Sequence, residues 1–294
     1  MNYCKEITIL IVLYEENIDL LSKNLINLRN FKIIIIDNGA DINLKNQITK
    51  KFNIYKYIIN EKNNGYTKGY NQAIKICDTK YALILEPDCY ILEENILKLY
   101  RSYQKYNDCL ITVPVSYDNN YQLTYSSGYF PENFTNHNPF EISGDTCVQV
   151  VLGSSMFFET KKIYDLGCLD ENFFIYYSDY DLCRRIYKIK KSIIQIQDSF
   201  CIHTHGISKV GNKYKKIFLR ENHLLFDELY YFYKIDKHIE KLINLKRKIL
   251  NYITKTIFSI FTLKLEKTTF LVARIFAYFR FLFFLKKLNS INKK

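Results

Sequence analysis

Three short apolar runs, each followed directly by polar residues, constrain the fold of this chain more than any other feature. Ile7–Leu13, Ile33–Ile36 and Leu83–Leu85 are continuous and lack the alternation of a half-exposed strand. Such runs are typical of strands buried on both faces of a parallel sheet. Helical segments follow two of them, over Ile18–Leu28 and Glu93–Tyr106. The pattern predicts an α/β fold with a doubly wound, mostly parallel sheet.

The remaining elements are less regular. Tyr55–Ile59 and Leu110–Val115 are predicted strands, and Thr67–Ile76 is a predicted helix. Residues 116–146 have no clear period, which indicates hairpins or a mobile loop. Val148–Phe158 returns as a strand that Gly153-Ser154-Ser155 interrupts, and the chain from Lys213 onward is predicted to be helical.

Length, composition and cysteine spacing narrow the class of protein. With 294 residues and 48% hydrophobic content, the chain suits one large domain or one domain with an appendage. Its eight cysteines form no C-x-x-C pair, which favours reduced thiols in a cytosolic protein. Ile7–Tyr14 is too short for a signal peptide, and Glu15-Glu16 follows where a cleavage site would need small residues.

The net charge of +12 lies entirely at the C-terminal end. Residues 209–294 hold 20 Lys and Arg against 6 Asp and Glu, and residues 1–208 are close to neutral. Basic residues interleaved with Phe, Leu and Ile favour an anionic membrane surface over a nucleic acid. Arg274 and Arg280 interrupt the apolar stretch Thr268–Leu285, and each would cost roughly 2.5–3.5 kcal/mol at a bilayer centre, so interfacial contact is expected rather than a span. The alternative is a helical subdomain with ordinary solvated lysines.

Acidic residues follow the predicted strands, where open α/β sheets bind ligands. Asp37 ends the second apolar run, and Asp88 follows the run that ends at Leu85. A second acidic feature is the aromatic-rich segment Phe173–Arg185, which contains Asp179. A carboxylate against an apolar wall can serve as a general base, although Asp179 could equally be the cap of a helix.

These motifs, in their order along the chain, resemble a known family. They are the apolar run before Tyr14, Ile35-Ile36-Asp37-Asn38-Gly39, Asn64-Gly65-Tyr66 with Gly69-Tyr70-Asn71, Glu86-Pro87-Asp88, Phe173–Arg185, and His203 with Gly206 and Ser208. Over residues 5–225 the chain resembles inverting glycosyltransferases of family 2, which have the GT-A fold, and is close to the rhamnosyltransferase-like branch. The resemblance implies a GT-A catalytic domain, assigned to residues 1–208, and the charge distribution indicates a basic amphipathic helical extension over residues 209–294.

The resemblance also implies a donor site for a nucleotide diphosphate-sugar. By similarity, Asp37 receives a ring N–H of the nucleobase, and Glu86 can reach the ribose hydroxyls. The nucleotide and sugar are expected to be lined by Asn64, Gly65, Gly69 and Asn71. Turn geometry at a helix start is an alternative reason for the two glycines.

The same resemblance implies a divalent cation. Asp88 would bind Mg²⁺ or Mn²⁺ through oxygen, and His203 would be a second ligand or a diphosphate contact, with His205 the weaker candidate. The family usually has Asn or Asp at the position of Glu86. A simple strand-end turn around Pro87 is the alternative explanation.

Asp179 matches the catalytic base of the family. The preceding position is usually acidic and is Ser178 here, which removes a like charge beside the base and leaves the acceptor class open. Asp181 and Arg185 match the rest of the motif and are expected to pair. Arg220 and Asn222 resemble an Arg–Asn element near the phosphates.

The sequence therefore predicts a cytoplasmic enzyme, peripheral on the inner face of the cell membrane. It would transfer a sugar, rhamnose or a related hexose, to a growing lipid-linked or cell-surface glycan. A dehydrogenase would need G-x-G-x-x-G after the first strand, where Tyr14-Glu15-Glu16-Asn17 stands instead. Since Ser178 departs from the family, a non-catalytic relative that binds nucleotide sugars is the main alternative.

Overall fold

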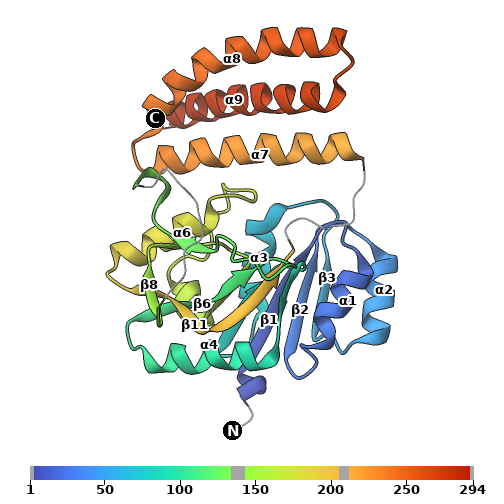
Figure 1. Cartoon of the computed structure of the whole chain (residues 1–294), viewed down its shortest axis with the longest axis vertical. Coiled ribbons are helices and arrows are strands. Elements are labelled where there is room, and N and C mark those ends of the chain that lie inside the picture. Colours follow the sequence, from blue (N-terminus) through green and yellow to red (C-terminus); the bar gives the residue numbers. More distant parts are fainter. Residues whose placement is uncertain (1–2, 134–142, 205–211, 292–294) are drawn as a thin grey trace. The chain divides into compact units, whose positions relative to one another are not determined.

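The chain forms two compact units in a computed structural model that describes residues 3–133, 143–204 and 212–291 (Figure 1). The sheet unit comprises Met1–Glu171 and Asp179–Lys209. The helical unit comprises Asn172–Ser178 and Val210–Lys294. The short segment before Asp179 therefore groups with the C-terminal helices, and each unit is described by itself below.

The sheet unit is built on one mixed sheet, which among the described residues has nine strands. Eight of them follow the order β3-β2-β1-β4-β10-β6-β11-β5, and β8 pairs with β11. The four strands from β3 to β4 are parallel, as are β6 and β11, while β10, β5 and β8 run antiparallel to their neighbours. The strands are β1 (Ile7–Leu13), β2 (Lys32–Asp37), β3 (Lys56–Ile59), β4 (Tyr81–Leu85), β5 (Cys89–Ile91), β6 (Cys109–Tyr117), β8 (Thr146–Val148), β10 (Ser155–Glu159) and β11 (Ser192–His203). A separate two-stranded sheet joins β7 (Ser127–Gly128) to β9 (Val150–Val151).

Helices cover both faces of the parallel half of the sheet. Alternate residues of β1, from Ile7 to Leu13, enter one core with the apolar sides of three helices, α1, α2 and α4. The other face of β1 packs against α3, where Gly69 lies so close that an added Cβ would be 2.7 Å from Val12 Cγ1. The helices of this unit are α1 (Ile18–Ile26), α2 (Ile42–Lys51), α3 (Gly65–Ile76), α4 (Glu93–Lys105), α5 (Thr160–Asp165) and α6 (Ser178–Lys188), with 3₁₀ turns η1 (Tyr3–Glu6) and η2 (Pro131–Asn133). The structure thus confirms the predicted α/β fold with a doubly wound sheet, in which the strands from β3 to β4 form a parallel half and the remainder of the sheet is mixed.

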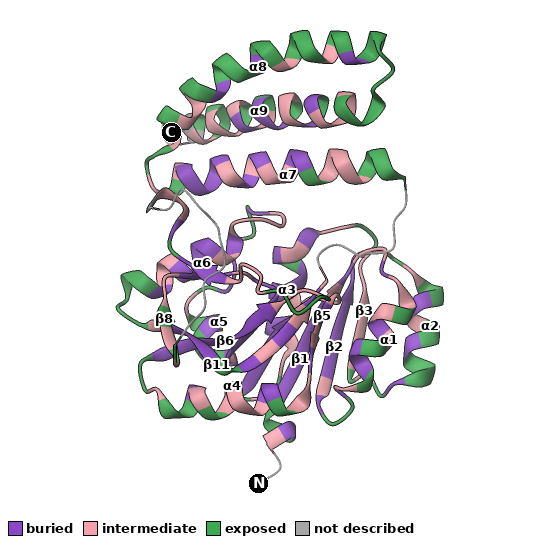
Figure 2. Ribbon diagram, in the orientation of Figure 1, coloured by how far each residue is buried: buried purple, intermediate pink, exposed green. Residues whose placement is uncertain are grey.

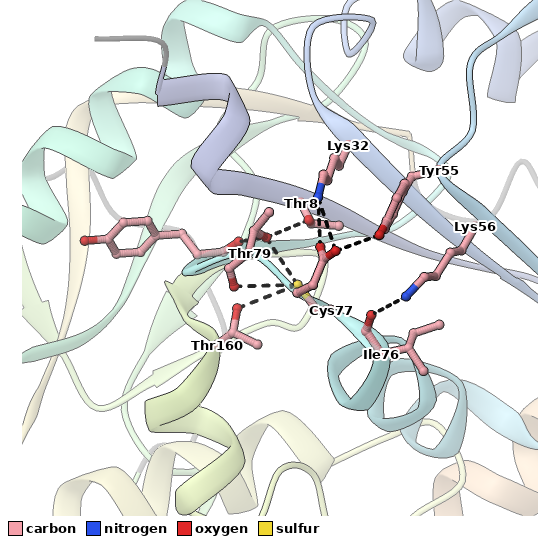
Figure 3. Close-up of polar contacts among 10 residues, drawn as sticks. Thr8, Lys32, Tyr55, Lys56, Ile76, Cys77, Thr79 and Thr160 are labelled. Carbon is pink, nitrogen blue, oxygen red and sulfur yellow. Dashed lines mark hydrogen bonds and ion pairs between the residues drawn. The ribbon is translucent and has the colours of Figure 1, made fainter.

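Polar residues at the amino ends of the strands bind one another (Figure 3). Asp78, in the turn before β4, accepts hydrogen bonds from Lys32 Nζ at 3.0 Å and Tyr55 Oη at 2.6 Å. The hydroxyls of Thr8 and Thr79 are 2.6 Å apart. These contacts tie the starts of β1, β2 and β4 together.

The helical unit consists of three long helices and the segment Asn172–Ser178. The helices are α7 (Lys213–Lys234), α8 (His238–Phe261) and α9 (Leu265–Ile291). The helix α9 packs against both α7 and α8, and its two arginines contact α7. Arg274 Nη1 lies 3.0 Å from Glu221 Oε2, and the Arg280 guanidinium lies 3.9 Å from the centre of the Phe226 ring.

Exposed residues make up much of α8, as Figure 2 shows. Many large apolar residues are among those exposed on α8 and at its turn into α9. Phe261 is 82% exposed and Leu263 is 80% exposed. Phe281, by contrast, is fully buried, so only part of the phenylalanine-rich sequence is available for contact with another surface. Among the described residues, one stretch, Leu265–Leu288, is long and apolar enough by composition to cross a membrane.

Candidate active site at the carboxyl ends of the strands

Three potential metal ligands meet where β4, β5 and β11 come together. Glu86 follows β4, Asp88 precedes β5, and His203 ends β11, directly opposite Cys89 in the antiparallel β5–β11 pair. His203 Nε2 lies 3.2 Å from Glu86 Oε2 and 3.4 Å from Asp88 Oδ1. One ligand atom from each residue lies within 4.8 Å of the others.

The chemistry of this cluster suits a divalent cation. Burial by itself would lower the pKa of His203, but hydrogen bonds and the charges of Asp88 and Glu86 outweigh it and raise the pKa to about 10. The histidine thus holds a proton between two carboxylates, at a place where a cation would also be stabilised. Two carboxylate oxygens and an imidazole nitrogen fit Mn²⁺ or Mg²⁺, and binding the metal would release that proton.

Asp179 is the second residue of α6 and is held in place by backbone amides. Its Oδ2 accepts a hydrogen bond from Gly153 N at 2.9 Å, and its Oδ1 accepts one from Tyr180 N at 2.9 Å. Burial raises its pKa to about 6, the two amides oppose that rise, and the charge of Glu86 adds to it. A carboxyl with a pKa near 6 is ionised at neutral pH and remains basic enough to accept a proton from a hydroxyl as it reacts.

Gly153, where the predicted strand Val148–Phe158 is interrupted, is also a residue of this site. A Cβ at this position would lie 2.2 Å from Tyr66 Oη and 3.6 Å from Asp179 Cβ. Tyr66 Oη also donates to Gly153 O at 2.6 Å. Glycine is therefore needed for the backbone to pass between the tyrosine and the carboxylate. The glycine itself was the only local sign of this role, because its partners, Tyr66 and Asp179, lie 87 and 26 residues away in the sequence.

Asp37 is almost fully buried at the end of β2. Its Oδ1 accepts a hydrogen bond from Gly39 N at 2.7 Å, and its Oδ2 accepts one from Tyr57 Oη at 3.0 Å. Burial raises its pKa, and these hydrogen bonds partly oppose the rise. Because each carboxylate oxygen has two acceptor positions, Asp37 can still accept a further N–H.

The residues around the start of α3 have clear structural contacts. Gly65 has a φ of +82°, which favours glycine, and Asn64 precedes it without a side-chain hydrogen bond to the helix end. The Asn71 amide bonds the backbone of Leu169 in both directions, at 2.8 and 3.0 Å. Turn geometry and close packing thus account for Gly65 and Gly69, and Asn71 holds the Leu169 backbone. The nucleotide contacts predicted for these residues stay predictions.

Asp181 and Arg185 of the Phe173–Arg185 motif pair with each other, as expected. Arg185 Nε lies 3.0 Å from Asp181 Oδ2, and its Nη1 donates to Leu166 O at 2.6 Å. The Ser178 hydroxyl is buried without a hydrogen-bond partner among the described residues. Arg220 contacts Glu221 within the helical unit. His205, Gly206 and Ser208 lie outside the described residues.

Comparisons with known proteins identify the family. The family model for glycosyl transferase family 2 matches residues 8–161, just over half of the chain. The chain is 27% identical over 223 residues to the low-salt glycan biosynthesis hexosyltransferase Agl10 of Haloferax volcanii, and the match covers 69% of each protein.

Solved structures show the same fold. The mannosyltransferase PcManGT from Pyrobaculum calidifontis, solved with GDP-Man and Mn²⁺, matches with a TM-score of 0.56 and 11% identity over 95% of this chain and 88% of that one. GalNAc-T7, solved with UDP, GalNAc and Mn²⁺, matches with a TM-score of 0.60 and 12% identity over 78% of this chain. The match spans 50% of the GalNAc-T7 chain.

The sheet order, the acidic cluster at its carboxyl edge and these neighbours define a GT-A fold with a C-terminal helical region. The chain belongs to glycosyltransferase family 2.

Proposed function

We propose that this glycosyltransferase moves a hexosyl unit from a nucleotide diphosphate-sugar to a glycan acceptor, with inversion and with the help of a divalent cation. The observation that carries the proposal is the cluster of Glu86, Asp88 and His203 at the carboxyl edge of the sheet. The charge of Glu86 in this cluster also acts on Asp179. The similarity to a hexosyltransferase supports the same chemistry, as do the Mn²⁺ and GDP-Man bound to PcManGT and the Mn²⁺, UDP and GalNAc bound to GalNAc-T7.

Asp88 and His203 would hold the cation, and Glu86 would complete its surroundings or bind the ribose. When bound, the cation supplies positive charge that neutralises the leaving diphosphate. Asp37 would accept a hydrogen bond from a ring N–H of the nucleobase. The segment from Asn64 to Asn71 would approach the diphosphate and sugar through its backbone.

Asp179 would act as the general base. Its carboxylate takes the proton of the acceptor hydroxyl while that oxygen forms a bond to the anomeric carbon, and the bond to the diphosphate oxygen breaks on the opposite side. One displacement inverts the anomeric carbon, and the electron pair of the broken bond leaves with the nucleotide diphosphate. The hydrogen bonds from Gly153 and Tyr180 aim the carboxylate without neutralising it.

The identity of the donor can be tested with a panel of nucleotide sugars that includes rhamnosyl, mannosyl and other hexosyl donors. We expect release of nucleotide diphosphate that requires Mn²⁺ or Mg²⁺ and an acceptor glycan. Donor binding without any turnover across glycan and lipid-linked acceptors would favour the alternative, a non-catalytic nucleotide-sugar-binding relative. The departure that motivates this alternative is Ser178, where the family usually has an acid.

The helical unit is proposed to bind an anionic membrane surface, which would place the enzyme at the inner face of the cell membrane beside a lipid-linked or cell-surface glycan. The supporting feature is an apolar tip, which we define as the exposed residues Ile257, Phe258, Ile260, Phe261, Leu263 and Leu265. Exposed Lys255, Lys264 and Lys267 flank it. Apolar insertion and attraction of lysines to anionic lipid act together in such a surface.

Surface contact accounts for the arginines of α9 better than a span does. Arg274 pairs with Glu221, and Arg280 contacts Phe226, so a spanning α9 would have to give up both contacts with α7. We therefore propose that residues 209–294 are a membrane-associating extension of a catalytic domain over residues 1–208. Because α8 and α9 pack with α7, point variants are a better probe of this surface than truncation.

Vesicle binding tests the proposal for the membrane surface. The 294-residue chain should bind phosphatidylserine vesicles at low salt and bind them more weakly, but still measurably, at high salt. The combined change Phe258→Ser, Phe261→Ser and Leu263→Ser should reduce binding at least about tenfold, because each side chain contributes apolar area. Ile42→Ser, at an exposed apolar residue of α2, is the matched control. Equal vesicle binding by the triple variant, or a wild-type dimer that the triple variant turns into a monomer, would contradict the proposal.

A further inference from the structure

The segment that leads to Asp179 is held by a buried carboxylate of α7. Three successive backbone amides donate to Asp227: Phe174 N at 3.2 Å, Ile175 N at 3.0 Å and Tyr176 N at 2.9 Å. Asp227 has no exposed surface. Its carboxylate therefore fixes three consecutive residues, 174–176. The proposed base, Asp179, lies three residues after Tyr176.

Side chains of the same segment also contact α7. The Phe174 ring stacks on His223, with ring centres 3.8 Å apart and planes 15° from parallel. Burial, reinforced by the charge of Arg280, lowers the pKa of His223 to about 4, so the stacked imidazole is neutral at physiological pH. The Tyr177 and Tyr231 rings lie 5.4 Å apart, and Asn172 Nδ2 donates to Tyr230 Oη at 3.2 Å. Contacts with α7 thus run from Asn172 to Tyr177.

This arrangement is costly for the folded state, which points to a role beyond packing. Burial raises the pKa of Asp227 to about 6, while the three amides and the charge of Arg280 oppose the rise. Apolar residues at a buried charged position often give equal or greater stability. A carboxylate that binds successive amides nevertheless fixes backbone position more tightly than apolar contact does, because its hydrogen bonds are strong and directional.

We propose that Asp227 is a positioning residue for transfer, one that sets the place of Asp179 by holding the segment Asn172–Ser178. The proposal rests on the proposed function, in which Asp179 is the base. Asp179 follows Ser178 directly in the chain, so a shift of the segment is passed to the start of α6 through the backbone. The helical unit would then take part in catalysis as well as in membrane contact.

The test compares Asp227→Ala and His223→Ala with Glu228→Gln in the 294-residue enzyme. Asp227→Ala removes the acceptor of three amides, and His223→Ala removes the ring beneath Phe174 while leaving the carboxylate in place. Glu228→Gln changes the neighbouring acid of α7, which pairs with Lys241 instead. Since a displacement of about 1 Å at a reacting group can cost about 10²-fold, kcat should fall by about 10–10²-fold in Asp227→Ala and by less in His223→Ala.

The split between kinetic parameters separates positioning from general loss of structure. The donor KM and the Mn²⁺ requirement should stay within about twofold of wild type, because the proposed donor contacts lie in the sheet unit. Hydrogen exchange of the amides at 174–176 should accelerate in Asp227→Ala and stay unchanged in Glu228→Gln. Asp227→Asn, which keeps an acceptor oxygen, should restore most of kcat.

Two failures can be told apart. If Asp179→Asn is inactive but the Asp227 and His223 variants, both folded, transfer at the wild-type rate, the positioning proposal is overturned and the base assignment stands. If Asp179→Asn is as active as wild type, the proposed mechanism itself is wrong. Should Asp227→Ala fail to fold, His223→Ala and the hydrogen exchange of segment 172–178 decide the matter.

Discussion

Aspartates lie at both ends of the parallel strands, but their pKa values are shifted in opposite directions. At the amino ends, Tyr55 and Lys32 both bind Asp78, and hydrogen bonds from these two residues lower its pKa. At the carboxyl ends, burial raises the pKa of Asp179 to about 6, and His203 lies between two acids. The ionised Asp78 at the amino ends therefore stabilises the folded chain. At the carboxyl ends, burial makes the ionised form of Asp179 less favourable than it is in water. Such perturbed groups are typical of functional sites.

The strongest way to break this comparison is to change the proposed base. Asp179→Asn keeps the shape of the side chain and removes its ability to accept a proton, so transfer should fall by about 10²–10⁴-fold. Donor affinity in the presence of Mn²⁺ should change little. Transfer assays with saturating donor, together with calorimetric titration of donor, measure both effects. An active Asp179→Asn enzyme would move the role of base to another group.

The metal cluster is the next test. Asp88→Ala removes a carboxylate ligand, and we expect the Mn²⁺-dependent part of donor affinity to fall by about 10²-fold, because a bound cation contributes several kcal/mol at a diphosphate. Calorimetry with and without Mn²⁺ isolates that part. Circular dichroism should show an intact fold. Unchanged metal-dependent affinity would exclude Asp88 as a principal ligand.

The pH dependence sharpens the comparison further. Because Asp179 must be deprotonated to act, kcat should rise about tenfold per pH unit below its pKa and level off above about 6. Stability has the opposite sign. The folded-state pKa of Asp179 lies above its unfolded value, so its contribution to stability is present below about pH 4 and is lost as the pH rises through about 6.

Asp179→Asn checks both signs in one protein. The variant should lose the acid limb of the rate profile and also part of the fall in stability between pH 4 and pH 7. Asp227, whose pKa is also raised to about 6, should continue to titrate in it. Thermal unfolding across this pH range measures the second effect, and identical stability profiles for variant and wild type would contradict the assignment.

The smallest effect is expected at the amino ends of the strands. Asp78→Asn weakens a half-exposed pair with Lys32, so the Tm should fall by about 3 °C or less. Transfer and donor affinity should both equal those of wild type, since the network in Figure 3 contains no proposed site residue. A large loss of activity in this variant would mean that the two ends are not functionally distinct.

Local sequence determined the parallel half of the fold. The continuous apolar runs gave β1 its observed bounds, Ile7–Leu13, and located β2 and β4 to within two residues at each end, because strands buried on both faces leave an unambiguous pattern. Since the acids follow those runs directly, the positions of Asp37 and Asp88 at the strand ends could also be predicted. Short elements such as β5 and α5 were missed, because three to six residues carry too little periodicity.

Tertiary structure alone decided which of these residues meet. His203 joins Glu86 and Asp88 only because β11 pairs with β5 in one register, and Gly153 donates to Asp179, which lies 26 residues further along the chain. The same holds for Asp227, whose partners at 174–176 are about fifty residues away, and for Arg274, which the sequence marked as a cost and the structure pairs with Glu221. Local patterns record burial and backbone preference, whereas contacts between distant residues depend on strand order and helix packing, which only the folded chain specifies.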